Sequence, residues 1–313
     1  MGKVYDCIIL GGGPAGLAAG LYAGRSRLDT LIIERAQDGG QIAITDELEN
    51  YPGQIPEGES GKALVARMTE QVKRFGAERC SDVVKSVELS GPIKKIVCAK
   101  GEYEAKTVII ATGAHSRPIG CENEGKFIGT GISFCATCDA AFFEDLEVYV
   151  VGGGDSAVEE AMYLTKFARK VTVIHRRNEL RAVKSIQEKA FKNPKIFFMW
   201  DSVVTKVDGE DILQKMWVKN VKTGEETLIE ADPEDGLFGL FGFIGYVPNS
   251  EIFEGQIEME NGYIPTNPDM HTNIPGVFAA GDIRVKSLRQ VVTACADGAI
   301  AAMQAEKYIS DLE

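Results

Sequence analysis

The sequence predicts an α/β protein made of two similar units, each with a parallel sheet flanked by helices. A strand, a glycine-rich turn and a helical stretch follow one another twice along the chain. Each copy continues into a second short apolar strand, which is typical of Rossmann-like units that bind dinucleotides. The length of 313 residues suits two domains of ordinary size better than one.

Composition excludes several classes of protein. The formal net charge is −12, and we find no basic stripe of the kind that nucleic-acid-binding proteins carry. No apolar run approaches the roughly 18 residues of a membrane span, and the longest, residues 236–247, is glycine-rich and fits a buried strand. Residues 1–3 lead straight into a strand, which leaves no room for a signal peptide. We therefore expect a soluble, cytoplasmic protein.

The two glycine turns predict two dinucleotide sites. The first glycine of such a turn permits a tight bend, and the second lets the backbone approach a pyrophosphate. The third small residue lets helix pack on strand, and the helix N-terminus faces the phosphate charge. A single copy is weak evidence, but two copies in the same context are specific. The expected contacts are Gly11, Gly13, Pro14, Ala15 and Gly16 in the first turn, and Gly152, Gly154, Asp155, Ser156 and Ala157 in the second.

The end of the second strand in each copy distinguishes the ligands. Glu34 and His175 stand at the same distance from the first glycine of their turns. A carboxylate there suits a ribose with free hydroxyls, whereas basic residues suit a 2′-phosphate. The first site therefore fits FAD or NAD. His175 with Arg176, Arg177 and Arg181 predicts NADPH at the second, although these arginines alone would also fit a solvated charge cluster.

Several later features favour FAD over a second nicotinamide cofactor at the first site. A glycine pair with an amide side chain can approach a flavin ring, a carboxylate at a strand end can bind a ribityl hydroxyl, and the positive end of the last helix can stabilise negative charge on a reduced flavin. Each feature alone also fits an ordinary strand end, but their order along the chain favours FAD. The residues concerned are Gly40, Gln41, Ala111, Thr112, Gly113, Gly281, Asp282, Arg289, Gln290 and Val291.

Cys135 and Cys138 are the only close pair among the seven cysteines. Their spacing allows a small reversible disulfide. A zinc site would need further ligands, but a second Cys-x-x-C is missing and the three histidines are scattered. Beside two dinucleotide motifs, redox use is a better interpretation than half of a zinc site or two unrelated buried cysteines. Asp139 directly follows the pair and is a candidate acid–base group, or else a helix cap.

With these motifs assembled, the sequence closely resembles the low-molecular-weight bacterial thioredoxin reductases over essentially its whole length. The resemblance implies a homodimer with a two-dinucleotide-binding flavoprotein fold, in which the NADPH domain is inserted into a discontinuous FAD domain. Residues 1–113 and 245–313 would then form the FAD domain and residues 114–244 the NADPH domain with the disulfide. We expect further FAD contacts at Arg35 and Asn50.

The resemblance also implies a mechanism. Hydride passes from NADPH to FAD, the reduced flavin attacks the sulfur of Cys138, and Cys135 leaves and later attacks thioredoxin. Asp139 supplies the proton. Because the disulfide and the nicotinamide would lie on one domain, we expect them to take turns at the flavin by rotation about residues 113–120 and 241–248.

Three other functions compete with this interpretation. Reductases of similar fold that take electrons from ferredoxin lack NADPH motifs, whereas residues 152–157 and the arginines are present here. Reductases of peroxiredoxin systems generally carry an extra N-terminal thioredoxin-like module, for which the sequence before Gly11 leaves no room. A flavin-binding sensor without turnover would have little reason to keep Cys135 and Cys138 together.

Overall fold

The computed structural model describes residues 3–44, 48, 50–55 and 59–312. The chain divides into two compact units, one of residues 1–115 and 247–313 and the other of residues 116–246. The boundaries expected from the sequence, 113/114 and 244/245, fall next to those of the structure, 115/116 and 246/247. None of the described helices is long and apolar enough to cross a membrane.

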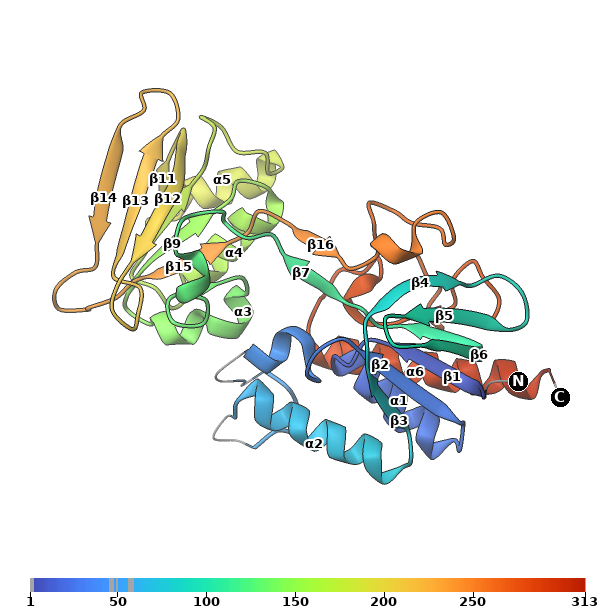
Figure 1. Cartoon of the computed structure of the whole chain (residues 1–313). Helices are drawn as coiled ribbons and strands as arrows, with labels where there is room; N and C mark the ends of the chain where they lie inside the picture. Colours follow the sequence, from blue (N-terminus) through green and yellow to red (C-terminus); the bar gives the residue numbers. More distant parts are fainter. Residues whose placement is uncertain (1–2, 45–47, 49, 56–58, 313) are drawn as a thin grey trace. The chain divides into compact units, whose positions relative to one another are not determined.

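The first unit is built on a seven-stranded sheet (Figure 1). Its strands are β1 (Val4–Leu10), β2 (Thr30–Glu34), β3 (Glu78–Ser81), β4 (Val84–Glu88), β5 (Lys94–Cys98), β6 (Glu102–Ile110) and β17 (Val277–Ala279). The order is β3-β2-β1-β6-β5-β4, and β17 pairs with the last residues of β6. All neighbours are parallel except in the β4–β5–β6 meander, which is antiparallel.

Both faces of the central strand β1 are buried, which explains why it is a continuous apolar run. Cys7 and Ile9 pack against the helices, and Ile8 and Leu10 pack on the opposite face. The helices of this unit are α1 (Pro14–Arg25), α2 (Gly61–Arg74) and α6 (Val291–Ser310), with short 3₁₀ turns η1 (Gly40–Ile44), η4 (Glu251–Phe253) and η5 (Gly281–Ile283). The close approach of α1 and α6 depends on Gly298, because a Cβ there would collide with the Ala15 carbonyl.

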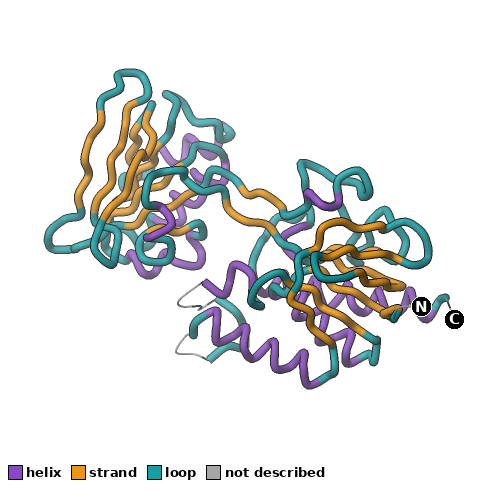
Figure 2. Tube along the Cα trace, viewed as in Figure 1, coloured by secondary structure: helices purple, strands orange, loops and turns teal. Residues whose placement is uncertain are grey.

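The second unit contains a five-stranded parallel sheet in the order β11-β10-β9-β15-β8. Its strands are β8 (Ile132–Ser133), β9 (Glu147–Val151), β10 (Lys170–Ile174), β11 (Ile196–Met199) and β15 (Gly239–Gly242). An antiparallel sheet adds β12 (Ser202–Asp208), β13 (Lys215–Asn220) and β14 (Glu226–Glu230). The helical segments, purple in Figure 2, are η2 (Glu124–Lys126), α3 (Ala136–Asp139), η3 (Ala140–Phe143), α4 (Asp155–Leu164) and α5 (Lys184–Lys192).

The chain passes from one unit to the other in two strands, β7 (Ala114–Ser116) and β16 (Tyr246–Pro248), which pair with each other. A glycine with positive φ precedes each strand: Gly113 at 68° and Gly245 at 111°. These values lie in the left-handed region, which glycine adopts without steric cost. The crossings are therefore short and carry glycine at the points where the chain bends.

Candidate functional site

The first glycine turn has the shape that a dinucleotide requires. Gly11 has a φ of 111°, and a Cβ on it would collide with the Ala111 carbonyl. A Cβ on Gly16 would likewise collide with the Gly11 carbonyl, so the turn lies tightly against α1. The nearest atom to a Cβ on Gly13 is 4.0 Å away, so a side chain would fill open space in front of the helix N-terminus. These are the conditions for backbone approach to a pyrophosphate.

Glu34 lies at the end of β2 and closes the same turn. Its Oε2 accepts a hydrogen bond from the Gly12 N–H at 2.7 Å, and its Oε1 accepts one from the Ala36 N–H at 3.0 Å. An ionised carboxylate has about four acceptor positions, so ribose hydroxyls can still donate to it. Arg35 is exposed beside it. Glu34 therefore orients the turn as well as offering oxygens to a ligand.

The other segments expected at the FAD site converge on this turn within the first unit. The Gly39 N–H donates to the Gly12 carbonyl at 2.8 Å, and Gly40 has a φ of 57° with its Cβ direction facing Gly13. A Cβ on Gly281 would come within 2.8 Å of the Ala15 Cβ. The carboxyl ends of the parallel strands β1, β6 and β17 thus meet at one edge, where ligands of such sheets bind.

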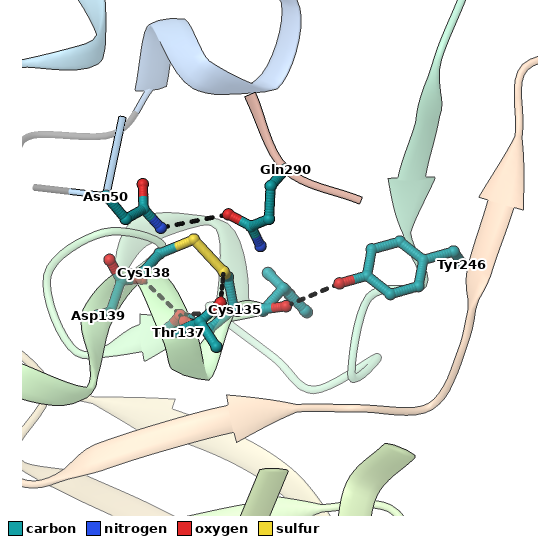
Figure 3. Close-up of a disulfide and its surroundings, with 9 residues drawn as sticks. Asn50, Cys135, Thr137, Cys138, Asp139, Tyr246 and Gln290 are labelled. Carbon is teal, nitrogen blue, oxygen red and sulfur yellow. Dashed lines mark hydrogen bonds between the residues drawn. A yellow bond between two sulfur atoms is a disulfide. The ribbon is translucent and has the colours of Figure 1, made fainter. Parts of the chain in front are cut away.

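Gln41, Thr112, Asn50 and Gln290, also expected at the FAD site, form side-chain hydrogen bonds within the protein. The side-chain amide of Gln41 donates to the Ala114 carbonyl at 2.5 Å. The Thr112 hydroxyl donates to the Asn249 carbonyl at 2.8 Å. The Asn50 amide donates to Gln290 Oε1 at 3.2 Å, as Figure 3 shows. Gln290 also caps α6, which begins at Val291, through a reciprocal pair of bonds with Thr293.

Two buried polar atoms without a partner among the described residues mark the C-terminal part of this site. They are Oδ1 of Asp282, in η5, and Nε of Arg289, whose guanidinium lies 4.4 Å from the centre of the Tyr263 ring. Buried acceptors and donors normally have partners, so each points to a ligand group. A ribityl hydroxyl would donate a hydrogen bond to the Asp282 carboxylate, and a polar atom of the flavin ring would accept one from the Arg289 guanidinium. The residues present therefore fit FAD.

A buried charge cluster that the sequence did not reveal supports this turn. Asp297, on α6, accepts hydrogen bonds on Oδ2 from the Gly281 N–H at 3.0 Å and the Lys286 ammonium at 2.8 Å. Arg284 forms an ion pair with the same oxygen at 2.8 Å. Because all three side chains are nearly buried, solvent screens their mutual attraction less than at a surface. Only the fold brings Asp297 beside residues 281–286, since no local motif contains them.

The Asp282→Asn variant should separate stability from flavin binding. Burial raises the pKa of Asp282, although Lys286 and Arg289 partly offset this effect. A raised pKa in the folded state means that the ionised form opposes folding above the unfolded value, so at neutral pH the substitution should stabilise the apoprotein. It should also weaken FAD binding, by about tenfold, through loss of a charge-assisted hydrogen bond.

Thermal denaturation of the apoprotein, with and without added FAD, measures both effects of Asp282→Asn. We expect a higher midpoint than wild type without FAD and a smaller increase when FAD is added. Equal FAD-induced increases in the two proteins would contradict the proposed contact.

The second glycine turn, in the second unit, has the same geometry. A Cβ on Gly152 would meet the Ala157 Cβ and the Phe243 carbonyl, whereas Gly154 has open space for 4 Å around its Cβ direction. Asp155 begins α4 and accepts from the Val183 N–H at 2.7 Å, and Ser156 is exposed beside it. These contacts hold the turn while leaving its open side free for a pyrophosphate.

The basic segment folds back onto this turn. The Arg181 N–H donates to the Gly153 carbonyl at 2.7 Å, and the His175 ring lies directly behind Gly153. Burial, followed by the charges of Arg177, Arg176 and Arg181, lowers the pKa of His175, which is therefore neutral at pH 7. Its Nε2 is buried without a partner among the described residues. The three arginines are exposed and, within the described ranges, pair with no carboxylate, so their charges are available to a 2′-phosphate.

Cys135 and Cys138 form a disulfide at the start of α3, with their Cα atoms 5.3 Å apart (Figure 3). The other cysteines of the described chain are free thiols: Cys7, Cys80, Cys98, Cys121 and Cys295. Both bonded cysteines are partly accessible, which thiol–disulfide exchange requires. Thr137 Oγ1 lies 3.5 Å from the Cys135 sulfur, and the Tyr246 hydroxyl donates to the Phe134 carbonyl at 3.1 Å.

Asp139 ends α3 and points back to Ser133, whose hydroxyl donates to Oδ2 at 2.5 Å. The carboxylate therefore belongs to the same turn as the disulfide. Asp139 also precedes η3, where its side chain makes no capping hydrogen bond to the described residues of that turn. Ser133 belongs to none of the motifs in the sequence, although it lies only two residues before Cys135.

Comparisons with known proteins agree with this geometry. Residues 5–298 match the family described as pyridine nucleotide-disulphide oxidoreductase. A thioredoxin reductase from Peptoclostridium litorale is 60% identical over 313 residues, covering 100% of this chain and 99% of that protein. One from Listeria monocytogenes is 45% identical, covering 99% of this chain and 96% of that protein.

Solved structures of relatives show the same fold. The crystal structure of a Streptococcus pyogenes thioredoxin reductase has a TM-score of 0.92 at 45% identity, covering 98% of this chain and 99% of that one. A Lactococcus lactis thioredoxin reductase, described as the FR conformation, has a TM-score of 0.66 at the same identity and coverage. The α/β fold of the two-dinucleotide-binding flavoproteins is confirmed. The chain belongs to the thioredoxin reductases of the pyridine nucleotide-disulphide oxidoreductase family.

Proposed function

We propose that the protein reduces oxidised thioredoxin with electrons from NADPH, through FAD and the Cys135–Cys138 disulfide. The observation that carries this proposal is the disulfide with Asp139 on the same turn, in a chain with two open glycine turns. The enzyme is an oxidoreductase, and its cofactors are FAD and NADPH, as in its family. We assign FAD to the first unit and NADPH to the second.

The overall reaction conserves atoms and electrons. NADPH, one proton and a thioredoxin disulfide give NADP⁺ and a thioredoxin dithiol. Bound FAD supplies the conversion of a hydride into an electron pair that can cleave a disulfide. In this chain, the pair enters at Cys138, the sulfur–sulfur bond breaks, and Cys135 leaves as a thiolate to which Asp139 gives a proton. Asp139 then takes this proton back, and the Cys135 thiolate attacks the thioredoxin disulfide, so that one thioredoxin sulfur leaves and takes up a proton. The Cys138 thiolate attacks Cys135 in the mixed disulfide, which re-forms the Cys135–Cys138 bond and releases the second thioredoxin thiol.

We further propose that the second unit rotates between two half-reactions, about the crossings β7 and β16. In support, the Streptococcus pyogenes and Lactococcus lactis structures have the same sequence identity to this chain and the same coverage, yet their TM-scores are 0.92 and 0.66. Those two structures therefore do not share one arrangement. Gly113 and Gly245, with positive φ, are suited to absorb the change. A cross-link that fixes the units should block thioredoxin reduction but spare one half-reaction. Normal turnover of the locked protein would contradict rotation.

We propose a cytoplasmic homodimer. The family implies a dimer formed between FAD domains, and α1 and α6 of the first unit carry the exposed apolar side chains Tyr22, Val292, Ile300 and Met303. The five free cysteines suit a reducing compartment. Sedimentation equilibrium should give twice the chain mass, and a monomer at micromolar concentration would contradict the dimer.

The proposed function is tested by supplying oxidised thioredoxin with NADPH or NADH and following dithiol formation anaerobically. We expect rapid reduction with NADPH and slow reduction with NADH. The alternative functions make other predictions: a ferredoxin-dependent enzyme would respond to reduced ferredoxin instead, and an enzyme of a peroxiredoxin system would leave thioredoxin oxidised while reducing its own partner.

A further inference from the structure

Ser133 lies where the second unit's sheet leads into the disulfide turn. It is the last residue of β8, and its backbone pairs with Phe241 of β15, so its position is fixed by the sheet. The residue is 5% exposed. Two residues later the chain reaches Cys135, whose N–H donates to the Ser133 hydroxyl oxygen at 3.1 Å. The serine thus contacts the backbone of the disulfide turn.

The Ser133 hydroxyl has two possible acceptors for its single proton. Asp139 Oδ2 lies 2.5 Å from the serine oxygen, and the Cys135 carbonyl lies 3.3 Å from it. The Cys135 carbonyl also accepts from the N–H groups of Cys138 and Asp139, at 3.3 and 3.2 Å, and so is the weaker alternative for the hydroxyl. A hydroxyl rotates to suit its partners, so both acceptors can be used in turn.

These two acceptors match the two protonation states of Asp139. When Asp139 is ionised, the serine donates to Oδ2 in a charge-assisted hydrogen bond. When Asp139 is protonated, the carboxylic acid donates to the serine oxygen, and the serine proton turns to the Cys135 carbonyl. The oxygen-to-oxygen contact persists in both states. Asp139 can therefore lose and regain a proton without moving and without leaving a half-buried polar group unpartnered.

We infer that Ser133 is a positioning residue that holds Asp139 toward the disulfide in both protonation states and so sets the pH range of the disulfide step. This inference rests on the proposed role of Asp139 as proton donor in thioredoxin reduction. It predicts an effect confined to the step that uses the cysteines, because the hydrogen bonds of the Ser133 side chain to described residues all go to the disulfide turn.

The test compares Ser133→Ala, Ser133→Thr and Ser202→Ala in the FAD-loaded enzyme. Ser202 is a matched control: it lies in the same unit, is 6% exposed and donates to a backbone carbonyl two residues away, that of Trp200, at 2.7 Å. Each variant is assayed from pH 6 to 9 with oxidised thioredoxin. It is assayed separately with ferricyanide, which takes electrons from the flavin and bypasses the disulfide.

For Ser133→Ala we expect kcat/KM for thioredoxin to fall about tenfold at neutral pH, the size of one lost charge-assisted hydrogen bond. The limb of the pH profile on which activity falls as pH rises should move to higher pH. The reason is that losing the serine hydroxyl destabilises the Asp139 carboxylate more than it destabilises the protonated acid. Ferricyanide reduction should stay within about twofold of wild type. Ser133→Thr, which keeps the hydroxyl, should restore most thioredoxin activity and the wild-type limb, and Ser202→Ala should match wild type.

Two results would overturn the inference. One is a Ser133→Ala enzyme with wild-type thioredoxin activity and an unmoved pH profile. The other is an equal loss of ferricyanide activity, since the serine would then support the fold and not Asp139. Failure of the proposed function would look different, because the wild-type protein itself would not reduce thioredoxin with NADPH.

Discussion

Replacing Cys135 or Cys138 with serine should lower NADPH-dependent thioredoxin reduction by more than about a thousandfold, as expected when an essential nucleophile is removed. A serine oxygen cannot form the reversible disulfide that the described structure contains. Electron transfer from NADPH to the flavin needs neither sulfur. Ferricyanide reduction by each variant should therefore stay within about threefold of wild type.

The free cysteine Cys80 provides the control for this experiment. It lies on β3 in the first unit, and its sulfur is 3.2 Å from the Tyr103 hydroxyl, a contact that a serine can replace with a hydrogen bond. Cys80→Ser should reduce thioredoxin at the wild-type rate. Turnover by the Cys135→Ser, Cys138→Ser double variant above about 1% of wild type would show that electrons reach thioredoxin by another route.

The second large effect concerns Arg176, Arg177 and Arg181. Replacing all three with alanine should lower kcat/KM for NADPH by about a hundredfold or more, because exposed arginines still contribute charge-assisted bonds to a phosphate. NADH lacks the 2′-phosphate, so its kcat/KM should change by no more than about twofold. The preference for NADPH would then nearly disappear. Initial rates with each nucleotide, at fixed ionic strength, measure this change.

An exposed arginine elsewhere tests whether this effect is local. Arg27 lies just after α1 in the first unit, and Arg27→Ala removes the same kind of charge. We expect Arg27→Ala to leave kcat/KM for NADPH and kcat/KM for NADH unchanged. An equal loss with NADPH and NADH in the triple variant would contradict phosphate recognition and indicate damage to the second glycine turn instead.

The sequence predicted the parts of the fold that follow local rules. Both glycine turns, the strands on either side of each and the long last helix are where periodicity and glycine spacing placed them. The apolar stretch 236–247 was expected to be one buried strand. It forms β15 at Gly239–Gly242 and β16 at Tyr246–Pro248, because Gly245, with a φ of 111°, interrupts it. The antiparallel strands β12, β13 and β14 were not anticipated, since their short alternating patterns carry little signal.

The residues of the candidate site likewise fall into two groups, those that local sequence motifs predict and those that only the fold brings together. Residues in continuous motifs, such as Gly11, Gly152 and Cys135, could be chosen from spacing alone. Asp297 could not, because its partners lie more than ten residues earlier in the chain and meet it only when α6 folds back. Ser133 lies only two residues before Cys135, but a serine near a cysteine pair does not by itself predict a role. Its role depends on the folded turn, which brings its hydroxyl to Asp139.

The central claim is that electrons from NADPH reach the sulfurs of Cys135 and Cys138 by way of bound flavin. The most direct measurement is anaerobic addition of NADPH to the purified enzyme, followed by thiol alkylation and peptide mass spectrometry. We predict that both cysteines become labelled with NADPH, stay unlabelled without it, and stay unlabelled in protein stripped of FAD. A flavin that NADPH bleaches while Cys135 and Cys138 remain joined would contradict the account.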